Sequence, residues 1–315
     1  MSENIFVAGG AGFIGSNIVK TLAKTAKPRI VVYDVNAKEK RNGNVVSFQG
    51  DVFDSERLLA VMRKEEVSKV VDMIGLASIP ACRKDPAKSF QLNVASVQNV
   101  LEAMRLTDAE HLVFPSTAAV YGDVTDPKVN EDIEAKPTTI YGWHKLAAES
   151  LINGYAKDYG IDATILRVFN VYGDFLLEQG VISAFVRMAL KGTPLTIYGG
   201  GQLRDFVHLN DVVDAFINSI GNTSAFQKVI NVGSGVGLSI NNIGKMVLES
   251  FPNTEIVYEP TQNGEYGIYA DVSEMQSLLG CKALDPRVGV RVFIEKTKRE
   301  QQRAIKASTR VAISG

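Results

Sequence analysis

The sequence predicts an α/β fold: a doubly wound parallel sheet with a smaller α/β lobe interleaved into it. Three features of the 315 residues predict this fold. Short apolar runs alternate with helical patterns through the first half, a glycine-rich turn joins the first run to the first helical pattern, and the rhythm becomes less regular from about Gly173. Alternating strands and helices are typical of a parallel sheet with helices on both faces.

The first half of the chain supplies most of the predicted elements. Short apolar runs indicate strands at Asn4–Ala8, Ile30–Tyr33, Val45–Phe48, Lys69–Ile74, His111–Ser116 and Ala163–Val168. The segments between and after them indicate helices at Phe13–Lys24, Glu56–Lys64, Ala87–Leu106, Tyr141–Tyr159 and Val181–Lys191. Polar residues follow the carboxyl ends of several strands, which is where sheets of this kind bind their ligands.

The glycine-rich turn between the first strand and the first helix indicates a dinucleotide site. It contains Gly9, Gly12 and Gly15, and glycines let a backbone turn tightly and approach phosphate oxygens beside free helix N–H donors. Asp34 follows about 20 residues later, where a carboxylate binds a ribose. Asp34 also favours NAD over NADP, because it repels a 2′-phosphate. The alternative, a turn that merely packs a helix on a strand, is disfavoured by this context.

The second half of the chain returns to the sheet before it becomes irregular. Gly199–Gly201 predicts a loop, Asp211–Ile220 a helix, and Val229–Val232 a returning strand. We therefore expect an NAD-binding Rossmann domain over residues 1–172 and about 204–232, and a substrate-binding lobe over about 173–203 and 233–296. Residues 297–315 form a basic tail, which is typical of a frayed terminal helix.

Composition excludes several classes of function. A net charge of −1 gives no electrostatic footprint for nucleic acid, and no apolar run is long enough to span a membrane. The chain enters its first strand directly after Met1–Asn4, without a signal-peptide pattern. Two unpaired cysteines fit a reducing cytoplasm, and three scattered histidines predict no metal site.

Tyr141, Lys145 and Thr117 are the candidate catalytic residues. Tyr141 and Lys145 are four residues apart and share one helical face, where an ammonium lowers the pKa of a phenol. Such a phenol can take a proton from a sugar hydroxyl while hydride leaves the same carbon. Thr117 follows the fifth strand and can bond a substrate oxygen. Taken singly, each has a structural alternative, but their order behind the glycine turn on one sheet favours catalysis.

With these motifs the chain resembles the extended short-chain dehydrogenases/reductases, in their NAD-dependent nucleotide-sugar epimerase/dehydratase family, and within it most the UDP-glucose 4-epimerases. The matching segments extend from Asn4 to about Gly280. They are Gly9–Gly15, Asp34, Asp51-Val52, Asn93-Val94, Ser116–Gly122, Tyr141–Lys145, Arg167–Gly173, Arg204–His208, Asp211-Val212, Asn231–Gly233, Ala270-Asp271 and Leu278–Gly280.

The resemblance implies a role for each site residue. Tyr141 would be the acid/base, Lys145 would support it and hold the nicotinamide ribose, and Thr117 would orient the substrate oxygen. The implied cofactor contacts are Gly9, Gly12, Phe13, Ile14, Gly15, Asp34, Asp51, Val52, Leu76, Ala77, Asn93, Tyr141 and Lys145. The implied substrate contacts are Ser116, Thr117, Asn170, Arg204 and Asp271. For Arg204, a surface ion pair with Asp205 is the alternative.

The residues after Thr117 narrow the implied reaction. Family dehydratases carry an acidic pair there and decarboxylases usually a glutamate, whereas this chain has Ala118 and Ala119. The resemblance therefore favours 4-epimerisation of a nucleotide-diphosphate sugar through a 4-keto intermediate. The alternatives are a 4-dehydrogenase or 4-ketoreductase with net redox and, less favoured, a non-catalytic protein that senses a dinucleotide.

The resemblance also implies a partner, a second copy of the chain. The family pairs through the helices that hold Tyr141 and Asn93, so the resemblance implies a homodimer. The chain departs from the family at two places. Gly75 stands where the family has a histidine. Residues 262–267 lack the family's arginine. Either Arg187 or Arg204 contacts the diphosphate instead, or the substrate differs from the family's usual uridine-linked hexose.

Overall fold

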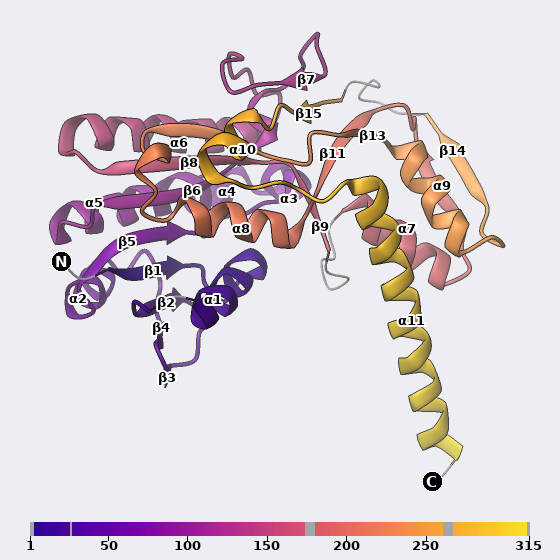
Figure 1. Ribbon diagram of the computed structural model, residues 1–315, viewed down its shortest axis with the longest axis horizontal. Helices are drawn as coiled ribbons and strands as arrows, with labels where there is room; N and C mark the ends of the chain where they lie inside the picture. The colour runs from indigo at the N-terminus through magenta and orange to yellow at the C-terminus, as the bar shows by residue number, and fades with distance from the viewer. Residues whose placement is uncertain (1–2, 26, 174–179, 261–266, 314–315) are drawn as a thin grey trace.

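A computed structural model describes residues 3–25, 27–173, 180–260 and 267–313, with side chains as far as Gln301 and without that of Thr25. Its centre is an eight-stranded sheet in the order β12-β8-β6-β5-β1-β2-β4-β3 (Figure 1). These strands are β1 (Asn4–Ala8), β2 (Ile30–Asp34), β3 (Lys40–Asn42), β4 (Val45–Gln49), β5 (Val67–Asp72), β6 (His111–Thr117), β8 (Asp162–Val168) and β12 (Lys228–Val232).

The sheet is parallel apart from its edge strand β3, which pairs antiparallel with β4. From β1 the chain adds β2 and β4 on one side, and then β5, β6 and β8 on the other. The strand order therefore reverses beside β1, and a crevice for a ligand forms at the carboxyl ends of the strands there. The predicted fold class, a doubly wound parallel α/β sheet, is confirmed.

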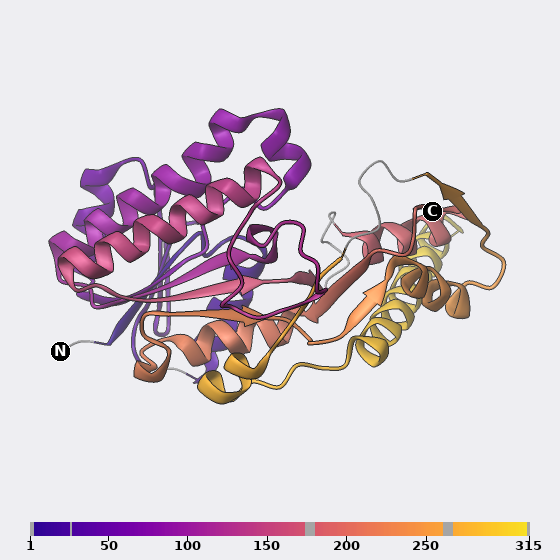
Figure 2. The same ribbon diagram turned by 90° about the horizontal axis from the view of Figure 1, so that it is seen from above.

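Helices cover both faces of the sheet (Figure 2). The helices α2 (Ser55–Lys64), α5 (Ser96–Thr107) and α6 (Ile140–Tyr159) pack on one face, and α1 (Phe13–Thr25) and α8 (Leu209–Ser219) pack on the other. Each layer encloses its own apolar core. Phe6, Leu101 and Phe114 lie in the first, and Ile18 and Phe216 lie in the second. Strands buried on both faces account for their nearly continuous apolar sequences.

Two predicted elements differ from the structure. The strand expected at Lys69–Ile74 is β5, which ends two residues earlier, at Asp72. The single helix expected at Ala87–Leu106 is divided into α4 (Pro86–Phe90), a π-helical turn over Gln91–Ala95, and α5. A π-helical turn inserts one extra residue between two α-helical segments, and the helical pattern of the sequence did not reveal where it lies.

A smaller group of elements continues from the sheet, on the right of Figure 1. It contains a three-stranded sheet of β9 (Asn170–Tyr172), β11 (Leu203–His208) and β13 (Gly237–Ser239), and a two-stranded sheet of β10 (Leu195–Tyr198) and β14 (Ile256–Glu259). The helices α7 (Val181–Leu190), α9 (Ile240–Ser250) and α11 (Pro286–Ile313) pack beside them. These elements enclose a core of their own, which includes Phe185, Ile243 and Phe293.

The remaining described elements are short. The strands β7 (Lys128–Val129) and β15 (Tyr269–Ala270) pair with each other, and α3 (Ile79–Lys84), α10 (Ser273–Leu279) and 3-10 turns at Ala118–Val120 and Thr223–Ala225 complete the described elements. The tail expected at residues 297–315 belongs to α11 as far as Ile313. Side chains beyond Gln301 lie outside the described part.

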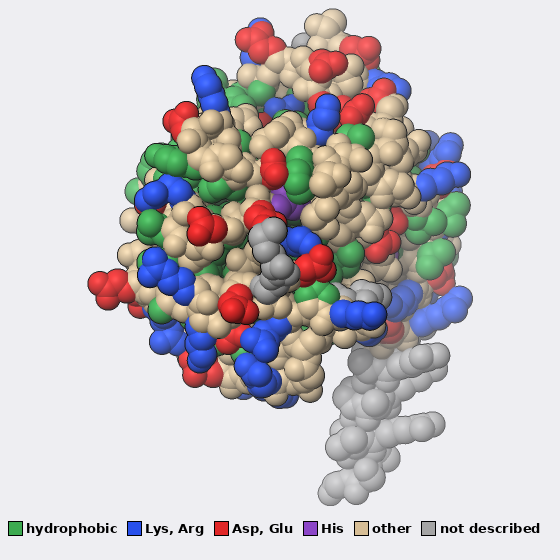
Figure 3. Space-filling model, turned by 60° about the vertical axis from the view of Figure 1, so that its left-hand side comes forward, with side chains coloured by type: hydrophobic (Ala, Val, Ile, Leu, Met, Phe, Trp, Pro, Cys, Tyr) green, Lys and Arg blue, Asp and Glu red, His purple; other side chains and the backbone are tan. Residues whose placement is uncertain are grey.

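The surface carries charges of both signs. Acidic and basic side chains are interspersed over the face in Figure 3. Among the described helices, none has the length and apolar character needed to cross a lipid bilayer.

Candidate active site

The glycine turn lies between the carboxyl end of β1 and the N-terminus of α1. Gly9 has a φ of +69°, and a Cβ built on it would lie 2.8 Å from the carbonyl carbon of Met73. A Cβ on Gly15 would lie 2.5 Å from the carbonyl oxygen of Gly9. Backbone therefore excludes side chains from both positions, and the glycines let the turn pack tightly at the N-terminus of α1, whose N–H groups suit a pyrophosphate.

Asp34 lies at the end of β2, next to this turn. Its carboxylate accepts the N–H of Ala11 at 3.1 Å and the N–H of Asn36 at 2.8 Å. Asp51 and Val52 follow β4 at the same edge, with Val52 buried and Asp51 exposed. The structure thus brings the predicted ribose and adenine residues to the edge of the sheet that holds the glycine turn.

Asn93 is placed differently from its expected role. It is 1% exposed and lies in the π-helical turn. Its Oδ1 accepts the N–H of Leu76 at 3.0 Å, and its Nδ2 donates to the carbonyl of Leu76 at 3.3 Å and to Ser89 Oγ at 3.3 Å. A side chain bonded in this way holds the loop of Leu76 and Ala77 in place. The predicted direct contact of Asn93 with the cofactor stays a prediction beside this structural role.

Thr117 and Tyr141 meet above the carboxyl end of β6. The Thr117 Oγ1 accepts the N–H of Ala119 at 3.2 Å, so its own hydrogen remains to be donated. Tyr141 lies in the first turn of α6, after the cap made by Thr139, and is 9% exposed. Burial raises the pKa of Tyr141 to about 12, and the Thr117 side chain acts to lower it.

Burial is the largest influence on the pKa of Tyr141, and the expected lowering of that pKa by Lys145 stays a prediction. The Lys145 ammonium lies over the ring of Phe114, 4.2 Å from its centroid. Burial lowers the pKa of Lys145, while the negative charges of Asp72 and Glu149 act to raise it. The ammonium therefore lies against the sheet and is attracted by those two carboxylates. The sequence motifs did not indicate Asp72 or Glu149 as partners of Lys145.

Ser116 belongs to a buried ion pair rather than to the open cleft. Its hydroxyl donates to Glu149, and the two carboxylate oxygens of Glu149 accept from Arg167 Nε at 3.1 Å and Nη2 at 2.8 Å. The Ser116 and Glu149 side chains and the pair's arginine are all buried. The Ser116 hydrogen is therefore directed to Glu149, and the predicted contact of Ser116 with substrate stays a prediction.

Asn170 and Arg204 share a cavity of about 180 Å³ on the smaller group of elements. Its lining also includes Tyr172, Ile182 and Phe206. Asn170 Nδ2 donates to the backbone carbonyl of Asp205 at 3.0 Å, and burial lowers the pKa of Arg204. The structure therefore brings together the two side chains expected at the nucleotide and diphosphate.

Asp205 and Asp271 have other partners than those expected. The Asp205 carboxylate accepts the N–H groups of Ser234, Gly235 and Ala270, at 2.7, 2.9 and 3.1 Å, so the alternative ion pair with Arg204 is not formed. The Asp271 carboxylate pairs with Lys128 at 2.8 Å, and that hydrogen bond lowers the pKa of Asp271 to about 2. Asp271 does not line the cavity of Asn170 and Arg204.

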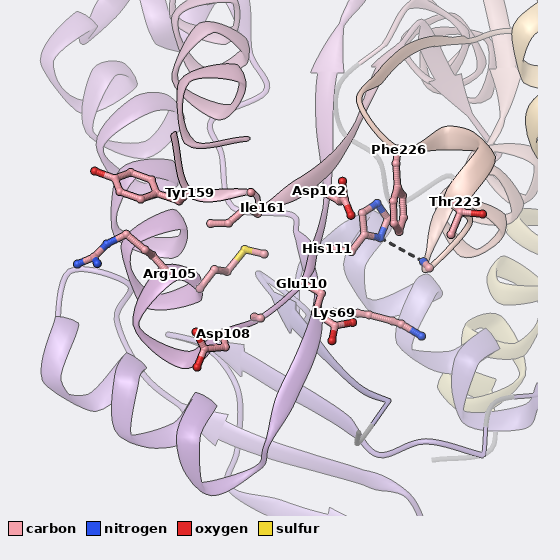
Figure 4. A pocket seen from close by; sticks show the side chains of 14 residues that line it. Lys69, Arg105, Asp108, Glu110, His111, Tyr159, Ile161, Asp162, Thr223 and Phe226 are labelled. Carbon is pink, nitrogen blue, oxygen red and sulfur yellow. Dashed lines mark hydrogen bonds between the residues drawn. The ribbon is translucent and has the colours of Figure 1, made fainter. Parts of the chain in front are cut away.

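A larger cavity, of about 530 Å³, opens at the amino ends of β6 and β8, on the edge opposite the glycine turn (Figure 4). His111 lies in it, with Nδ1 accepting the N–H of Gly221 at 3.1 Å and Nε2 bonded to Thr164 Oγ1 at 3.0 Å. Burial and the charge of Lys69 lower the pKa of His111 to about 4. A neutral histidine bonded on both nitrogens fits a structural role, and none of the predicted site residues lines this cavity.

Sequence reasoning missed two buried titratable groups near Lys145 of α6. Asp72 and Cys82 are both fully buried, and both act electrostatically on Lys145. The one signal in the sequence for a buried carboxylate was the position of Asp72 within an apolar strand. Within the described residues, no three His, Cys, Asp or Glu side chains gather as a metal site. Residues 261–266, where the family's arginine is missing, lie outside the described part.

Comparison with known proteins identifies close likenesses. Residues 5–233 match the family described as the NAD dependent epimerase/dehydratase family. A UDP-glucose 4-epimerase of Lacticaseibacillus casei is 31% identical over 275 residues, covering 79% of this chain and 83% of that protein. A UDP-N-acetyl-alpha-D-glucosaminuronate decarboxylase of Bacillus cytotoxicus is 30% identical, covering 82% of this chain and 84% of that protein. The crystal structure of Thermotoga maritima UDP-glucose 4-epimerase with UDP-glucose has a TM-score of 0.85 and 28% identity, covering 95% of this chain and 99% of that one.

Proposed function

We propose a reaction for this chain on one premise: it belongs to the NAD-dependent epimerase/dehydratase family. The proposed reaction is inversion at C4 of a nucleotide-diphosphate sugar through a transient 4-keto intermediate. The observation that carries this choice is the run Thr117-Ala118-Ala119 beside Tyr141. Alanines cannot titrate, so these positions offer no base or acid for protons on C5 or C6, and the remaining groups suit chemistry at C4 alone.

The residues of the glycine turn fit the family's cofactor. NAD, when bound, supplies a hydride acceptor and donor for C4. Gly9 and Gly15 keep side chains out of the turn, and the N-terminus of α1 offers N–H donors to a pyrophosphate. Asp34 would hold a ribose there. The further proposed contacts are Gly12, Phe13, Ile14, Asp51, Val52, Leu76, Ala77 and Lys145.

Tyr141 is the proposed acid/base. Its phenol would take the proton of the 4-hydroxyl as hydride leaves C4, and return it when hydride comes back to the other face. Burial opposes ionisation of this phenol, and Thr117 favours it by acting on the phenol oxygen. Lys145 adds a positive charge one helical turn away, inside the same low-dielectric region. Thr117 would also orient the sugar oxygen.

Arg204 and Asn170 are the proposed anchors of the nucleotide. A guanidinium donates to phosphate in a bidentate manner, and an amide can both donate to and accept from a base. Both side chains line the cavity of about 180 Å³, whose apolar members Ile182 and Phe206 suit a flat ring. Similarity to proteins named for UDP-sugars makes a uridine nucleotide the first substrate to test.

The reaction is tested by its redox balance. Protein as purified is incubated with a set of nucleotide sugars, without added cofactor, and the products are followed by mass spectrometry and proton NMR. We expect the C4 epimer of one sugar, at constant mass and without accumulation of reduced nicotinamide absorbance. Stoichiometric keto sugar together with reduced cofactor would instead assign a 4-dehydrogenase or 4-ketoreductase, and no conversion of any sugar would favour a sensing protein.

We further propose that the chain forms a homodimer through α6 and the neighbouring α4–α5 segment. The large apolar side chains exposed there include Phe90, Ile140 and Trp143, with exposed fractions of 50%, 37% and 53%. Phe90 and Trp143 are aromatic, a residue type enriched at protein interfaces. Such a surface gains stability when a second copy removes it from water.

The predicted domain division and location are also kept as proposals. The NAD-binding domain is proposed to comprise residues 1–172 and about 204–232, and the substrate lobe about 173–203 and 233–296. A cytoplasmic location is supported by Cys82 and Cys281, which are both buried and unpaired as disulfides.

A further inference from the structure

Asp72 is a buried carboxylate to which the proposed chemistry gives no task. It ends β5 and is 0% exposed. Its Oδ1 accepts the N–H of Ile74 at 3.1 Å, whereas its Oδ2 has no hydrogen-bond partner among the described residues. An ionised carboxylate in such a place costs considerable free energy unless a cation faces it. A cation is therefore expected to lie near the Asp72 carboxylate.

The register of the sheet places Asp72 beneath Lys145. The β5–β6 pairing matches Val71 with Val113, so the next position along β6, Phe114, lies beside Asp72. Neighbouring residues in register point to the same face of a sheet, and Phe114 belongs to the core beneath α5 and α6. The Lys145 ammonium lies over that same Phe114 ring. The side chains of Asp72, from β5, and Lys145, from α6, therefore enter the layer between sheet and helix from opposite sides.

The other titratable groups around Lys145 already have partners. Those that act on its ammonium are Asp72 from β5, Glu149 from α6 and Cys82 from α3, while Tyr141 lies one turn earlier on α6. Glu149 is neutralised by two hydrogen bonds from Arg167. The Cys82 thiol donates to a backbone carbonyl at 3.2 Å. Among these groups, Asp72 is the one whose negative charge has no nearer compensation than Lys145.

We propose that Asp72 is the buried counter-ion that keeps the Lys145 ammonium charged and in place over the Phe114 ring, beneath the helix that carries Tyr141. Asp72 is a positioning residue, since it acts through Lys145. The proposal rests on the proposed function in one respect, that the phenol needs a cation nearby. Burial raises the pKa of Asp72 and lowers that of Lys145, and each charge opposes the shift of the other. The two charges are therefore mutually dependent.

The direct test is the protonation midpoint of Lys145, measured without any turnover. Protein labelled with ¹³C-lysine is titrated between about pH 5 and 11, and the Cε chemical shift of Lys145 is followed, assigned by its loss in Lys145→Arg. We expect Asp72→Asn to lower this midpoint by about one pH unit or more, because a counter-charge at close range is removed. Should Asp72→Asn not fold, Asp72→Ala removes the same charge and is expected to give the same fall.

A matched control and a second readout complete the design. Asp108→Asn makes the same chemical change at the opposite edge of the sheet and is expected to leave the midpoint unaltered. In turnover, Asp72→Asn is expected to move the alkaline limb of the kcat profile to lower pH. A uniform loss of kcat at every pH, with an unchanged Lys145 midpoint, would overturn the proposal. If the wild-type protein converts no nucleotide sugar, the proposed function fails, while the Lys145 midpoint still decides the role of Asp72.

Discussion

Replacing Tyr141 with phenylalanine is expected to lower kcat by about 10²–10⁴-fold while NAD stays bound, since this is the usual contribution of a positioned acid/base. The substitution removes one oxygen from a side chain that is 9% exposed and leaves its ring in place. Without that oxygen, no group beside Thr117 can take the proton of the 4-hydroxyl. The measurement is the rate of C4 inversion, together with the NAD released when the protein is denatured.

Tyr198→Phe is the matched control for this experiment. Tyr198 lies on β10 and is 60% exposed, so the same loss of a hydroxyl is expected to leave the rate of inversion unchanged. Full activity of the Tyr141 variant would remove this residue from the role of acid/base. Loss of NAD together with activity would instead indicate that the Tyr141 hydroxyl helps to hold the cofactor.

Replacing Glu149 with alanine is expected to destabilise the protein by about 3–5 kcal/mol, which is typical when one member of a buried ion pair is removed. The Arg167 guanidinium would remain buried without its carboxylate, and Ser116 would lose its acceptor. The Arg167 Nη1 already has no hydrogen-bond partner among the described residues, so little compensation is at hand. The free energy of unfolding is measured by urea denaturation with two probes.

The pair of Glu249 and Arg291 offers a matched control with the same chemistry at the surface. Arg291 Nε and Nη2 donate to the two oxygens of Glu249 at 2.6 and 2.9 Å, and both side chains are about half exposed. Glu249→Ala is expected to cost about 0–1 kcal/mol, because water screens the pair. Equal losses in the free energy of unfolding for Glu149→Ala and Glu249→Ala would contradict the importance assigned to burial of the Glu149 pair.

Much of the fold was predictable because its signals are local. The β1 strand, the glycine turn and α1 follow one another within 25 residues, and each is specified by its own apolar spacing or by glycine. The family and its NAD dependence followed from the same motifs and are confirmed by the comparison with known proteins. The π-helical turn around Asn93 escaped prediction, because it depends on a contact with Leu76, 17 residues away.

The candidate site was predictable in outline and less so in its electrostatics. The order of Thr117 and Tyr141 along the chain indicated a shared site, and the structure brings their side chains together. The direction of the Ser116 hydroxyl could not be read from spacing, because it depends on Glu149, which comes from α6. The rise of the Tyr141 pKa could not be read either, because it depends on burial. Their roles in catalysis stay predictions until turnover is measured.

In the proposed reaction, one hydride leaves C4 of a nucleotide sugar and returns to the same carbon on the other face. The most direct measurement is incubation of the protein as purified with UDP-glucose that carries deuterium at C4. We expect a C4 epimer that retains its deuterium, formed by the wild-type protein and not by Tyr141→Phe. An epimer that carries hydrogen at C4, or deuterium transferred stoichiometrically into reduced cofactor, would contradict it.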